Sequence, residues 1–339
     1  MKIIGDKNEF IIAEIGQAHE GSLGLAHSYI DALAETGVDA VKFQTHIADA
    51  ESSEHEPFRV NFSYEDSTRM DYWRRMEFTL EQWIGLKKHC DEKGLKFISS
   101  PFSNAAVDLL EKVGISMYKI GSGEVNNFLM LEKIARTGKP IILSSGLSSY
   151  DELDEAVSFL NRYKNEVSLL QCTTAYPTKP EEWGLNVIHE LKRRYQLPVG
   201  FSDHSGDIYA CLAAAATGAE ILECHAVFSK QMFGPDTKAS LTIDQIKMLC
   251  EGVYQIRKAL DHPVDKTENI QFQELKQIFE KSLAVNRPMN KGDVIDFEDL
   301  EAKKPKGHGI DASLYKQVVG KTLKNEKKKW DFLKPEDLK

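Results

Sequence analysis

The chain has 339 residues, 42% of them hydrophobic and 28% charged, which is typical of a folded globular protein. Its net charge of −9 disfavours a nucleic-acid partner, and no apolar run approaches the about 18–20 residues of a membrane span. No signal peptide is expected. The five cysteines form no CxxC pair, which favours reduced thiols in a cytoplasmic protein.

Short apolar runs alternate with amphipathic segments along most of the chain. Strands are expected at Phe10–Ile15, Ala40–Gln44, Lys96–Ser100, Met117–Gly121, Pro140–Ser144, Val167–Cys172, Pro198–Ser202 and Glu220–His225. Helices are expected at Leu23–Glu35, Leu80–Lys93, Asn104–Val113, Leu129–Thr137, Tyr150–Tyr163 and Ile208–Thr217. Eight strand–helix units predict an α/β protein whose parallel strands close into a (β/α)8 TIM barrel. An open doubly wound sheet is the alternative, but no Gly-rich dinucleotide fingerprint follows the first strand.

Two segments depart from this alternation. Ile47–Phe78, after the second strand, is long enough to be a binding loop or an oligomer contact. After about Asp261 the pattern changes to short β-like pieces, at Ser282–Ile295 and Val318–Thr322. We therefore predict a barrel at residues 1–262, a linker at 263–280 and a small β-rich domain at 281–339.

Every expected strand ends in polar residues, and the carboxyl ends of barrel strands are where active sites lie. Lys42 and Lys119 come from different strands and are accompanied by Ser, Thr and Gly residues. Such a set suits a ligand that carries a phosphate and a carboxylate. The alternative is that each lysine pairs with a nearby Glu for structure alone.

His204 and His225 end the last two strands and are candidates for a pair of metal ligands. The alternative is a hydrogen-bonded core histidine on each strand. Asp203 is a candidate to orient a histidine, and Glu14 is either an acid–base group or the partner of Lys42.

For several other residues we expect structural roles only. Asp236 lies in a Gly-Pro-Asp turn, His19 and His46 are expected to be solvated loop residues, and Cys172 and Cys224 are expected to pack in layers around the barrel.

Seven short motifs together resemble the sialic acid synthase family, which includes the N-acetylneuraminate, legionaminate and pseudaminate synthases. They are Ala13-Glu-Ile-Gly16, Ala40-Val-Lys-Phe-Gln44, Lys119-Ile-Gly-Ser-Gly-Glu124, Leu143-Ser-Ser-Gly146, Gln171-Cys-Thr-Thr-Ala-Tyr-Pro177, Gly200-Phe-Ser-Asp-His204 and Gly234-Pro-Asp236. Ser282–Asp299 and Val319-Gly-Lys321 resemble the antifreeze-like (SAF) domain that follows the barrel in this family.

The resemblance implies an enzyme that condenses phosphoenolpyruvate with the aldehyde of a 2-acetamido sugar to a nine-carbon nonulosonic acid, and releases phosphate by C–O cleavage. It implies a divalent metal, most often Mn²⁺, held by His204 and His225, with Glu14 handling water or a proton. The positions matching phosphoenolpyruvate contacts are Lys42, Ser100, Lys119, Ser122, Ser144, Thr174 and Ser202. Those matching sugar contacts are Gln44, Glu124, Tyr176 and Asp236.

The chain departs from the family pattern on the acceptor side. It has Glu14-Ile-Gly-Gln-Ala-His-Glu-Gly21 where relatives commonly have Glu-Ile-Gly-x-Asn-His-Asn-Gly. In the small domain, Lys304 stands where relatives carry an Arg that reaches the sugar site of a partner subunit, so a homodimer with exchanged small domains is implied. The acceptor stays open among N-acetylmannosamine, its 6-phosphate and a 2,4-diacetamido-trideoxyhexose.

Two other functions stay open at this point. One is a non-catalytic sugar-binding barrel with a degenerate site. The other is a Schiff-base aldolase, which requires Lys42 or Lys119 to be uncharged.

Overall fold

The computed structural model describes residues 9–60, 62 and 64–339. The chain divides into two compact units, Met1–His262 and Pro263–Lys339, and each is described by itself.

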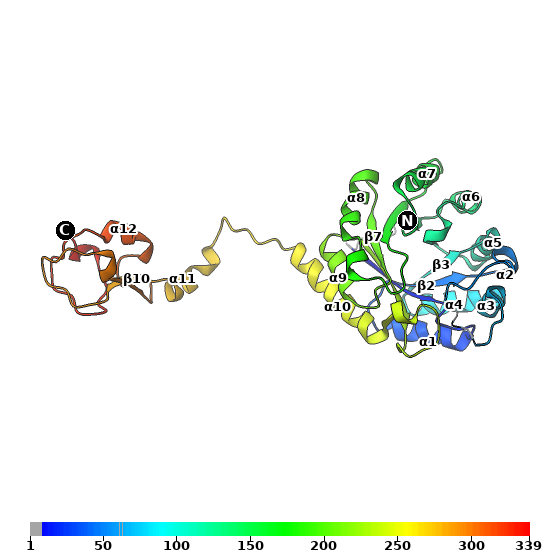
Figure 1. The fold of residues 1–339 in the computed structure, drawn as a ribbon, viewed down its shortest axis with the longest axis horizontal. Coiled ribbons are helices and arrows are strands. Elements are labelled where there is room, and N and C mark those ends of the chain that lie inside the picture. Colours follow the sequence, from blue (N-terminus) through cyan, green and yellow to red (C-terminus); the bar gives the residue numbers. More distant parts are fainter. Residues whose placement is uncertain (1–8, 61, 63) are drawn as a thin grey trace. The chain divides into compact units, whose positions relative to one another are not determined.

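The first unit is a closed parallel barrel (Figure 1). Its strands are β1 (Phe10–Gly16), β2 (Ala40–Thr45), β3 (Lys96–Pro101), β4 (Tyr118–Ile120), β5 (Ile141–Ser144), β6 (Val167–Cys172), β7 (Val199–Asp203) and β8 (Ile221–Val227). Each pairs with the next in parallel, and β1 pairs with β8 to close the ring; the two-residue β9 (Leu241–Thr242) is added to β8. The predicted TIM barrel is confirmed.

Helices surround the strands and follow from local sequence signals. They are α1 (Leu23–Ala34), α4 (Leu80–Glu92), α5 (Asn104–Val113), α6 (Phe128–Ala135), α7 (Tyr150–Asn161), α8 (Leu185–Tyr195), α9 (Tyr209–Ala216) and α10 (Ile243–Leu260). Thr79 begins α4 with a reciprocal capping box to Gln82, and α5 ends at Gly114, whose φ of 81° suits glycine. The long segment after β2 contains α2 (Ala48–Glu51) and α3 (Arg69–Met76).

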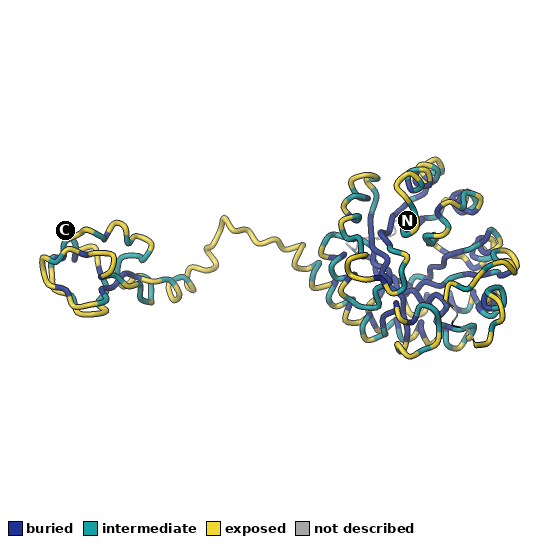
Figure 2. The backbone as a smooth tube through the Cα atoms, in the orientation of Figure 1, coloured by how far each residue is buried: buried dark blue, intermediate teal, exposed yellow. Residues whose placement is uncertain are grey.

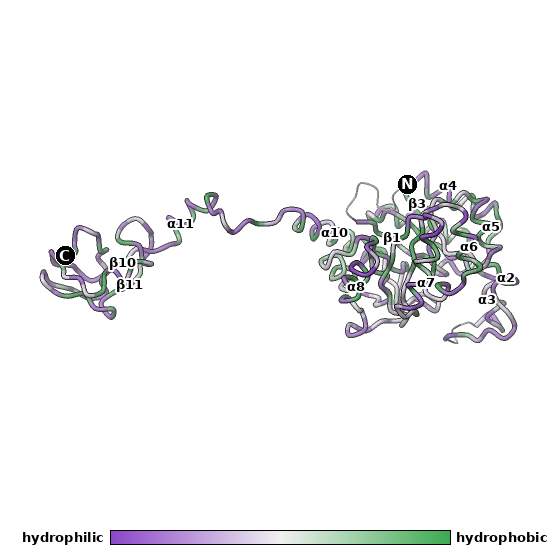
Figure 3. The backbone as a smooth tube through the Cα atoms, turned by 90° about the horizontal axis from the view of Figure 1, so that it is seen from above, coloured by the Kyte–Doolittle hydropathy of each residue, from purple (hydrophilic) through white to green (hydrophobic). Residues whose placement is uncertain are grey.

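The barrel core has two layers. Inside the ring, one apolar cluster consists of Phe10, Ile12, Ala40, Ile98, Met117, Ile142, Leu170 and Ile221. A larger cluster lies between strands and helices, so the strands are buried on both faces (Figure 2). Hydrophobic residues are concentrated along the barrel strands (Figure 3).

The second unit has a small core of its own, formed by Leu283, Val285, Met289, Ile295, Val318, Leu323 and Leu333. Its regular elements are the antiparallel pair β10 (Ser282–Val285) and β11 (Leu300–Lys303), and the helices α11 (Gln273–Phe279) and α12 (Tyr315–Val318). The expected β-like piece was wrong at Val318, which ends a helix. Val294 and Thr322, one from each of the two expected β-like pieces, form an isolated antiparallel bridge.

Within the described part of the chain, no helix is both long and apolar enough to cross a membrane.

Candidate active site

The polar site follows directly from the two-residue period of the strands. On β1, Ile12 lies in the inner apolar cluster and Glu14 comes two residues later; on β8, Ile221 lies in that cluster and is followed by Glu223 and His225. The same step leads from apolar to polar side chains on other strands. The barrel interior is therefore apolar at its amino-terminal end and polar at its carboxyl-terminal end.

One cavity of about 380 Å³ opens at this polar end. Its lining includes every barrel residue that the family resemblance assigns to a substrate or the metal: Glu14, Lys42, Gln44, Ser100, Lys119, Ser122, Glu124, Ser144, Thr174, Tyr176, Ser202, His204, His225 and Asp236. Eight strand ends thus supply a single site. Asp203, the candidate to orient a histidine, is not among the lining residues and accepts hydrogen bonds from Ser205 instead.

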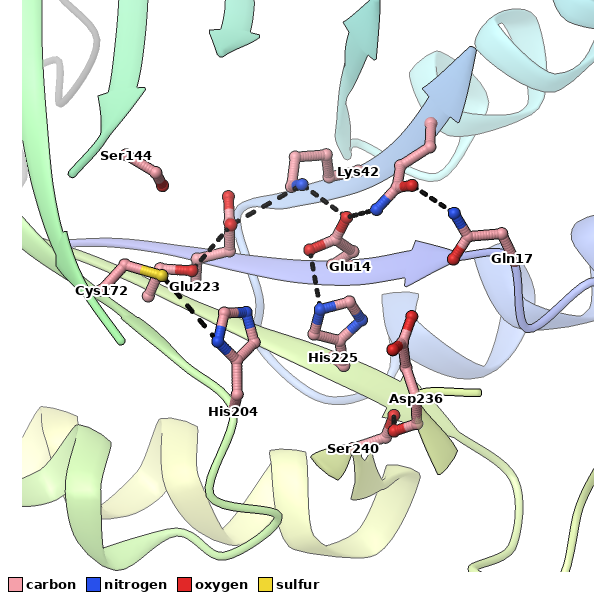
Figure 4. Close-up of polar contacts among 12 residues, drawn as sticks. Glu14, Gln17, Lys42, Ser144, Cys172, His204, Glu223, His225, Asp236 and Ser240 are labelled. Atoms are coloured by element: carbon pink, nitrogen blue, oxygen red, sulfur yellow. Dashed lines mark hydrogen bonds and ion pairs between the residues drawn. The ribbon is translucent and has the colours of Figure 1, made fainter. Parts of the chain in front are cut away.

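Two buried lysines, Lys42 and Lys119, alternate with two buried carboxylates in the floor of this cavity. Figure 4 shows Lys42 between Glu14 and Glu223. Lys42 Nζ lies 2.6 Å from Glu14 Oε1 and 3.6 Å from Glu223 Oε1, and Lys119 Nζ lies 3.4 Å from the same Glu223 oxygen. Lys119 also donates a hydrogen bond to Ser144 Oγ at 2.7 Å. Lys42 pairs with Glu14, as one of the alternatives from the sequence predicted. The pair nevertheless lines the cavity, so the ion pair and a ligand site are compatible.

The two lysines differ in their charge environment. Burial lowers the pKa of each, but Glu14 and Glu223 outweigh burial at Lys42, whose pKa is raised. At Lys119 burial prevails, and repulsion from Lys42 adds to it, so the pKa is lowered. Burial of Glu14 favours its neutral form, but the charges of His225, Lys42 and Lys119 outweigh burial and lower its pKa.

Hydroxyl groups and a glycine form the wall next to Lys119. The Gly146 N–H donates to Ser122 Oγ at 3.1 Å, and a Cβ on Gly146 would lie 2.6 Å from Thr174 Oγ1. Ser100 Oγ is buried and has no hydrogen-bond partner among the described residues. This wall offers donors to an oxyanion without a side chain in the way.

His204 and His225 face each other, with ring centroids 5.4 Å apart. Nδ1 of His204 lies 3.0 Å from the Thr173 carbonyl oxygen, and Nε2 of His225 lies 3.2 Å from Glu14 Oε2. Because these oxygens only accept, each neutral ring carries its proton there and keeps a lone pair on its other nitrogen.

The two rings fit a divalent metal by this chemistry. Among the described residues, no group of three or more His, Cys, Asp and Glu side chains could hold one, so a metal on this pair would keep positions for water or substrate. Cys172 lines the cavity with its Sγ 3.8 Å from His204 Nδ1, where the sequence indicated a packing role only.

The other end of the cavity is lined by residues of the insertion after β2. His46 is 3% exposed, and its ring lies between Trp73 and Phe102, with centroid distances of 3.9 and 4.5 Å. The expectation of a solvated His46 was therefore wrong. It was also wrong for His19, which is 1% exposed and packs on Phe78.

A chain of hydrogen bonds connects this end to the lysines. His46 Nδ1 donates to Glu51 Oε1 at 2.6 Å, which leaves Nε2 to accept from Gln17 Nε2 at 3.2 Å. Gln17 Nε2 also donates to Gln44 Oε1, and Gln44 Nε2 donates to Glu14 Oε1 at 2.7 Å. The orientation of both amides is thereby fixed.

Charged side chains complete this end. Arg59 stacks over the Tyr176 ring at 4.2 Å and pairs with Asp236. Glu124 accepts from Asn127 at 2.8 Å, and burial followed by repulsion from Glu51 raises its pKa despite that bond. Asp236 is thus both a turn residue and part of the cavity wall.

Several residues that line the cavity were not predicted from the sequence to belong to the site. They are Gln17, His46, Glu51, Glu56, Arg59, Arg69, Trp73, Phe102, Cys172 and Glu223. Glu223 had a usable signal, because it precedes His225 by two residues on one strand and so shares its face. Lys304 lies in the second unit, where its Nζ is 4.9 Å from the centre of the Phe279 ring.

Comparison with known proteins decides the family. Residues 29–265 match the NeuB family. The chain belongs to the NeuB family. It is 36% identical over 321 residues to N,N'-diacetyllegionaminic acid synthase of Campylobacter jejuni, covering 93% of this chain and 96% of that protein. It is 32% identical over 315 residues to human N-acetylneuraminate-9-phosphate synthase, covering 88% and 84%.

A solved structure agrees with this NeuB assignment. The N-acetylneuraminic acid synthetase of Leptospira borgpetersenii, crystallised with citrate, superposes with a TM-score of 0.70 at 31% identity, over 80% of this chain and 91% of that one. The resemblance noted from the motifs is thus confirmed at the level of the family.

Proposed function

We propose that this protein is a transferase that condenses phosphoenolpyruvate with the open-chain aldehyde of a 2-acetamido sugar, to form a nine-carbon nonulosonic acid and phosphate. The observation that carries the proposal is one cavity in which two buried lysines and a facing pair of histidines meet. Phosphoenolpyruvate brings a phosphate and a carboxylate, and Lys42 and Lys119 offer one ammonium group to each.

The reaction balances as follows. The π electrons of the C2=C3 bond form a bond from C3 to the aldehyde carbon, whose oxygen takes up a proton. Water adds to the cationic C2 and loses a proton. The C2 hydroxyl then becomes the ketone, as the bond from C2 to the phosphate oxygen breaks and phosphate leaves with the second proton.

The residues of the chain divide between the two substrates. On the donor side we assign Ser100, Ser122, Ser144, Thr174 and Ser202 to hydrogen bonds with phosphoenolpyruvate. On the acceptor side we assign Gln44, Glu124, Tyr176 and Asp236 to the sugar. Glu14 is assigned to hold a water molecule or a proton, since it lies between Lys42 and His225.

His204 and His225 would hold the divalent metal on which the family depends, and we propose Mn²⁺. When bound, such an ion polarises the sugar carbonyl as a Lewis acid. The lone pairs that the Thr173 and Glu14 contacts leave on the two rings support this assignment.

We further propose that the second unit is an antifreeze-like domain, and that two copies form a cytoplasmic homodimer in which each small domain covers the partner's cavity. Residues 281–339 carry 14 Lys and Arg against 10 Asp and Glu, a net +4, whereas the whole chain is −9. This opposite charge favours docking on an acidic barrel, and Lys304 is the candidate that reaches the sugar.

The test is a phosphate-release assay with Mn²⁺, phosphoenolpyruvate and each of three acceptors: N-acetylmannosamine, its 6-phosphate and a 2,4-diacetamido-trideoxyhexose. Release that requires both an acceptor and the metal is expected with one of them. Absence of release with all three, in protein that binds sugar but no phosphoenolpyruvate by calorimetry, would favour a non-catalytic sugar-binding barrel.

A Schiff-base aldolase is tested separately, because the lowered pKa of Lys119 meets one requirement of that chemistry. Borohydride treatment in the presence of pyruvate is expected to leave the mass of the protein unchanged. A stable adduct on Lys119 would establish the aldolase instead.

A further inference from the structure

The two carboxylate oxygens of Glu223 have very different surroundings. Oε1 lies 3.6 Å from Lys42 Nζ and 3.4 Å from Lys119 Nζ, and accepts a hydrogen bond from Ser202 Oγ at 3.0 Å. Oε2 is buried and has no partner among the described residues. Glu223 itself is 2% exposed. A buried carboxylate with one bare oxygen is costly, so its presence calls for an explanation.

Glu14, the other carboxylate of the floor, has both oxygens engaged. Its Oε1 contacts Lys42 and Gln44, and its Oε2 contacts His225. Balancing the charge of Lys42 therefore needs no second carboxylate, whereas Glu223 is the carboxylate that pairs with Lys119. What Glu223 adds is a negative charge that contacts both lysines at once.

The position between the lysines has a chemical meaning if the proposed function is right, on which this inference rests. In phosphoenolpyruvate the phosphate ester oxygen and the carboxylate are both attached to C2. If one ammonium group meets each of them, C2 lies between the two ammonium groups. Glu223 contacts both of these groups, so a C2 atom held between them would be close to its carboxylate.

C2 is also the atom that becomes positive. When C3 bonds to the aldehyde, C2 loses its share of the π electrons and becomes an oxocarbenium ion before water adds. A fixed anion next to this carbon stabilises the cationic C2 more than the uncharged C2 of the starting enol phosphate, and in a buried site the effect is large.

We propose that Glu223 is an electrostatic catalytic residue, whose carboxylate stabilises the cation that develops at C2 of phosphoenolpyruvate. The same charge opposes binding of the trianionic donor, because it competes for both lysines. Glu223 therefore weakens the binding of phosphoenolpyruvate and stabilises the transition state. Removing its charge should lower kcat without raising the KM for phosphoenolpyruvate.

The experiment compares wild type with Glu223→Gln, which removes the charge and keeps the shape. Phosphate release is measured with Mn²⁺ at a saturating acceptor concentration while phosphoenolpyruvate is varied. We expect kcat to fall on the order of 100-fold, while the KM for phosphoenolpyruvate stays the same or falls. Glu223→Asp keeps the charge and is expected to recover part of kcat.

The matched control is Glu220→Gln, which changes a carboxylate three residues earlier that pairs with Lys192 at the surface. Both constants are expected to stay at wild-type values. Thermal unfolding and calorimetric binding of phosphoenolpyruvate show whether Glu223→Gln is folded; if it is not, the comparison of wild type with Glu223→Asp decides, with a kcat at the wild-type level counting against the proposal.

The outcomes separate this inference from the proposed function. If wild type releases phosphate but Glu223→Gln keeps its kcat, or mainly raises the KM for phosphoenolpyruvate, Glu223 only positions the lysines and the inference is wrong. If wild type releases no phosphate with any acceptor, the proposed function itself fails.

Discussion

Arg59 Nη2 lies 2.6 Å from Asp236 Oδ1, which joins the insertion after β2 to the loop after β8 across the end of the cavity that we assign to the acceptor sugar. The guanidinium also stacks on Tyr176. Arg59→Ala removes both contacts, so two walls of this end lose their connection. We expect the KM for the acceptor sugar to rise several-fold while the KM for phosphoenolpyruvate stays unchanged, measured by phosphate release.

The control for this prediction is Arg136→Ala, which removes an arginine from an exposed pair with Glu132 on α6. Exposed pairs of this kind are screened by solvent and contribute little to stability, so no kinetic change is expected. An Arg59→Ala enzyme with an unchanged acceptor KM would show that the pair does not shape the acceptor site.

Gly146 is expected to tolerate no side chain. An added Cβ would lie 2.6 Å from Thr174 Oγ1 and 2.7 Å from Ser122 Oγ, so Gly146→Ala must displace both hydroxyls. We expect kcat/KM for phosphoenolpyruvate to fall by roughly 10- to 100-fold. Gly85→Ala is the control, since a Cβ there meets no atom within 4 Å; equal activities of the two variants would contradict this placement of the donor.

Removal of one histidine tests the metal. His204→Ala leaves one imidazole, so calorimetric binding of Mn²⁺ and metal-dependent turnover are expected to fall by more than about 100-fold. A chelator should abolish wild-type turnover, and added Mn²⁺ should restore it. His262→Ala, at an exposed position, is expected to behave as wild type. Normal metal-stimulated turnover in His204→Ala would remove this histidine from the site.

His19 makes the barrel sensitive to mild acid. Burial lowers its pKa from 6.5 to about 3, so the folded protein keeps this ring neutral while the unfolded chain takes up a proton below pH 6.5. The stability is fully present above pH 6.5 and is lost as the pH falls toward 3. Between pH 7 and 5 this amounts to about 2 kcal/mol.

His19→Gln has no proton to gain, so its free energy of unfolding should fall by less over the same pH range. Urea unfolding of both proteins at pH 7 and pH 5 measures the difference. Parallel losses in the two proteins would assign the acid sensitivity to other groups.

Strand positions could be predicted from the sequence because the strands are short apolar runs, several of which closely follow a glycine or a proline. Val167–Cys172 matches β6 at both ends, and Phe10–Ile15 falls one residue short of β1. The polar strand ends could be read for the same reason, since the closed ring forces the carboxyl ends of all strands to one mouth.

The contacts at the end of the cavity assigned to the acceptor could not be predicted from strand positions. His46 is buried because Trp73 stacks on it, and Trp73 lies on a helix of the long insertion. No periodicity relates two such positions, since a long loop leaves their separation open. Arg59 meets Asp236 from far along the chain for the same reason.

An unbroken run of contacts leads from Glu51 through His46, the two glutamines and Glu14 to Lys42. Under the proposed assignment of donor and acceptor residues, neither substrate is recognised by an independent set of side chains. A mutation that adapts the acceptor end to a different sugar would move the side-chain amide of Gln17 or Gln44. The hydrogen bond from Gln44 to Glu14 would then change, and with it the ion pair between Glu14 and Lys42. Acceptor preference in this enzyme would therefore evolve together with donor affinity, and variants selected for a new sugar would need second changes near Lys42 to recover their turnover.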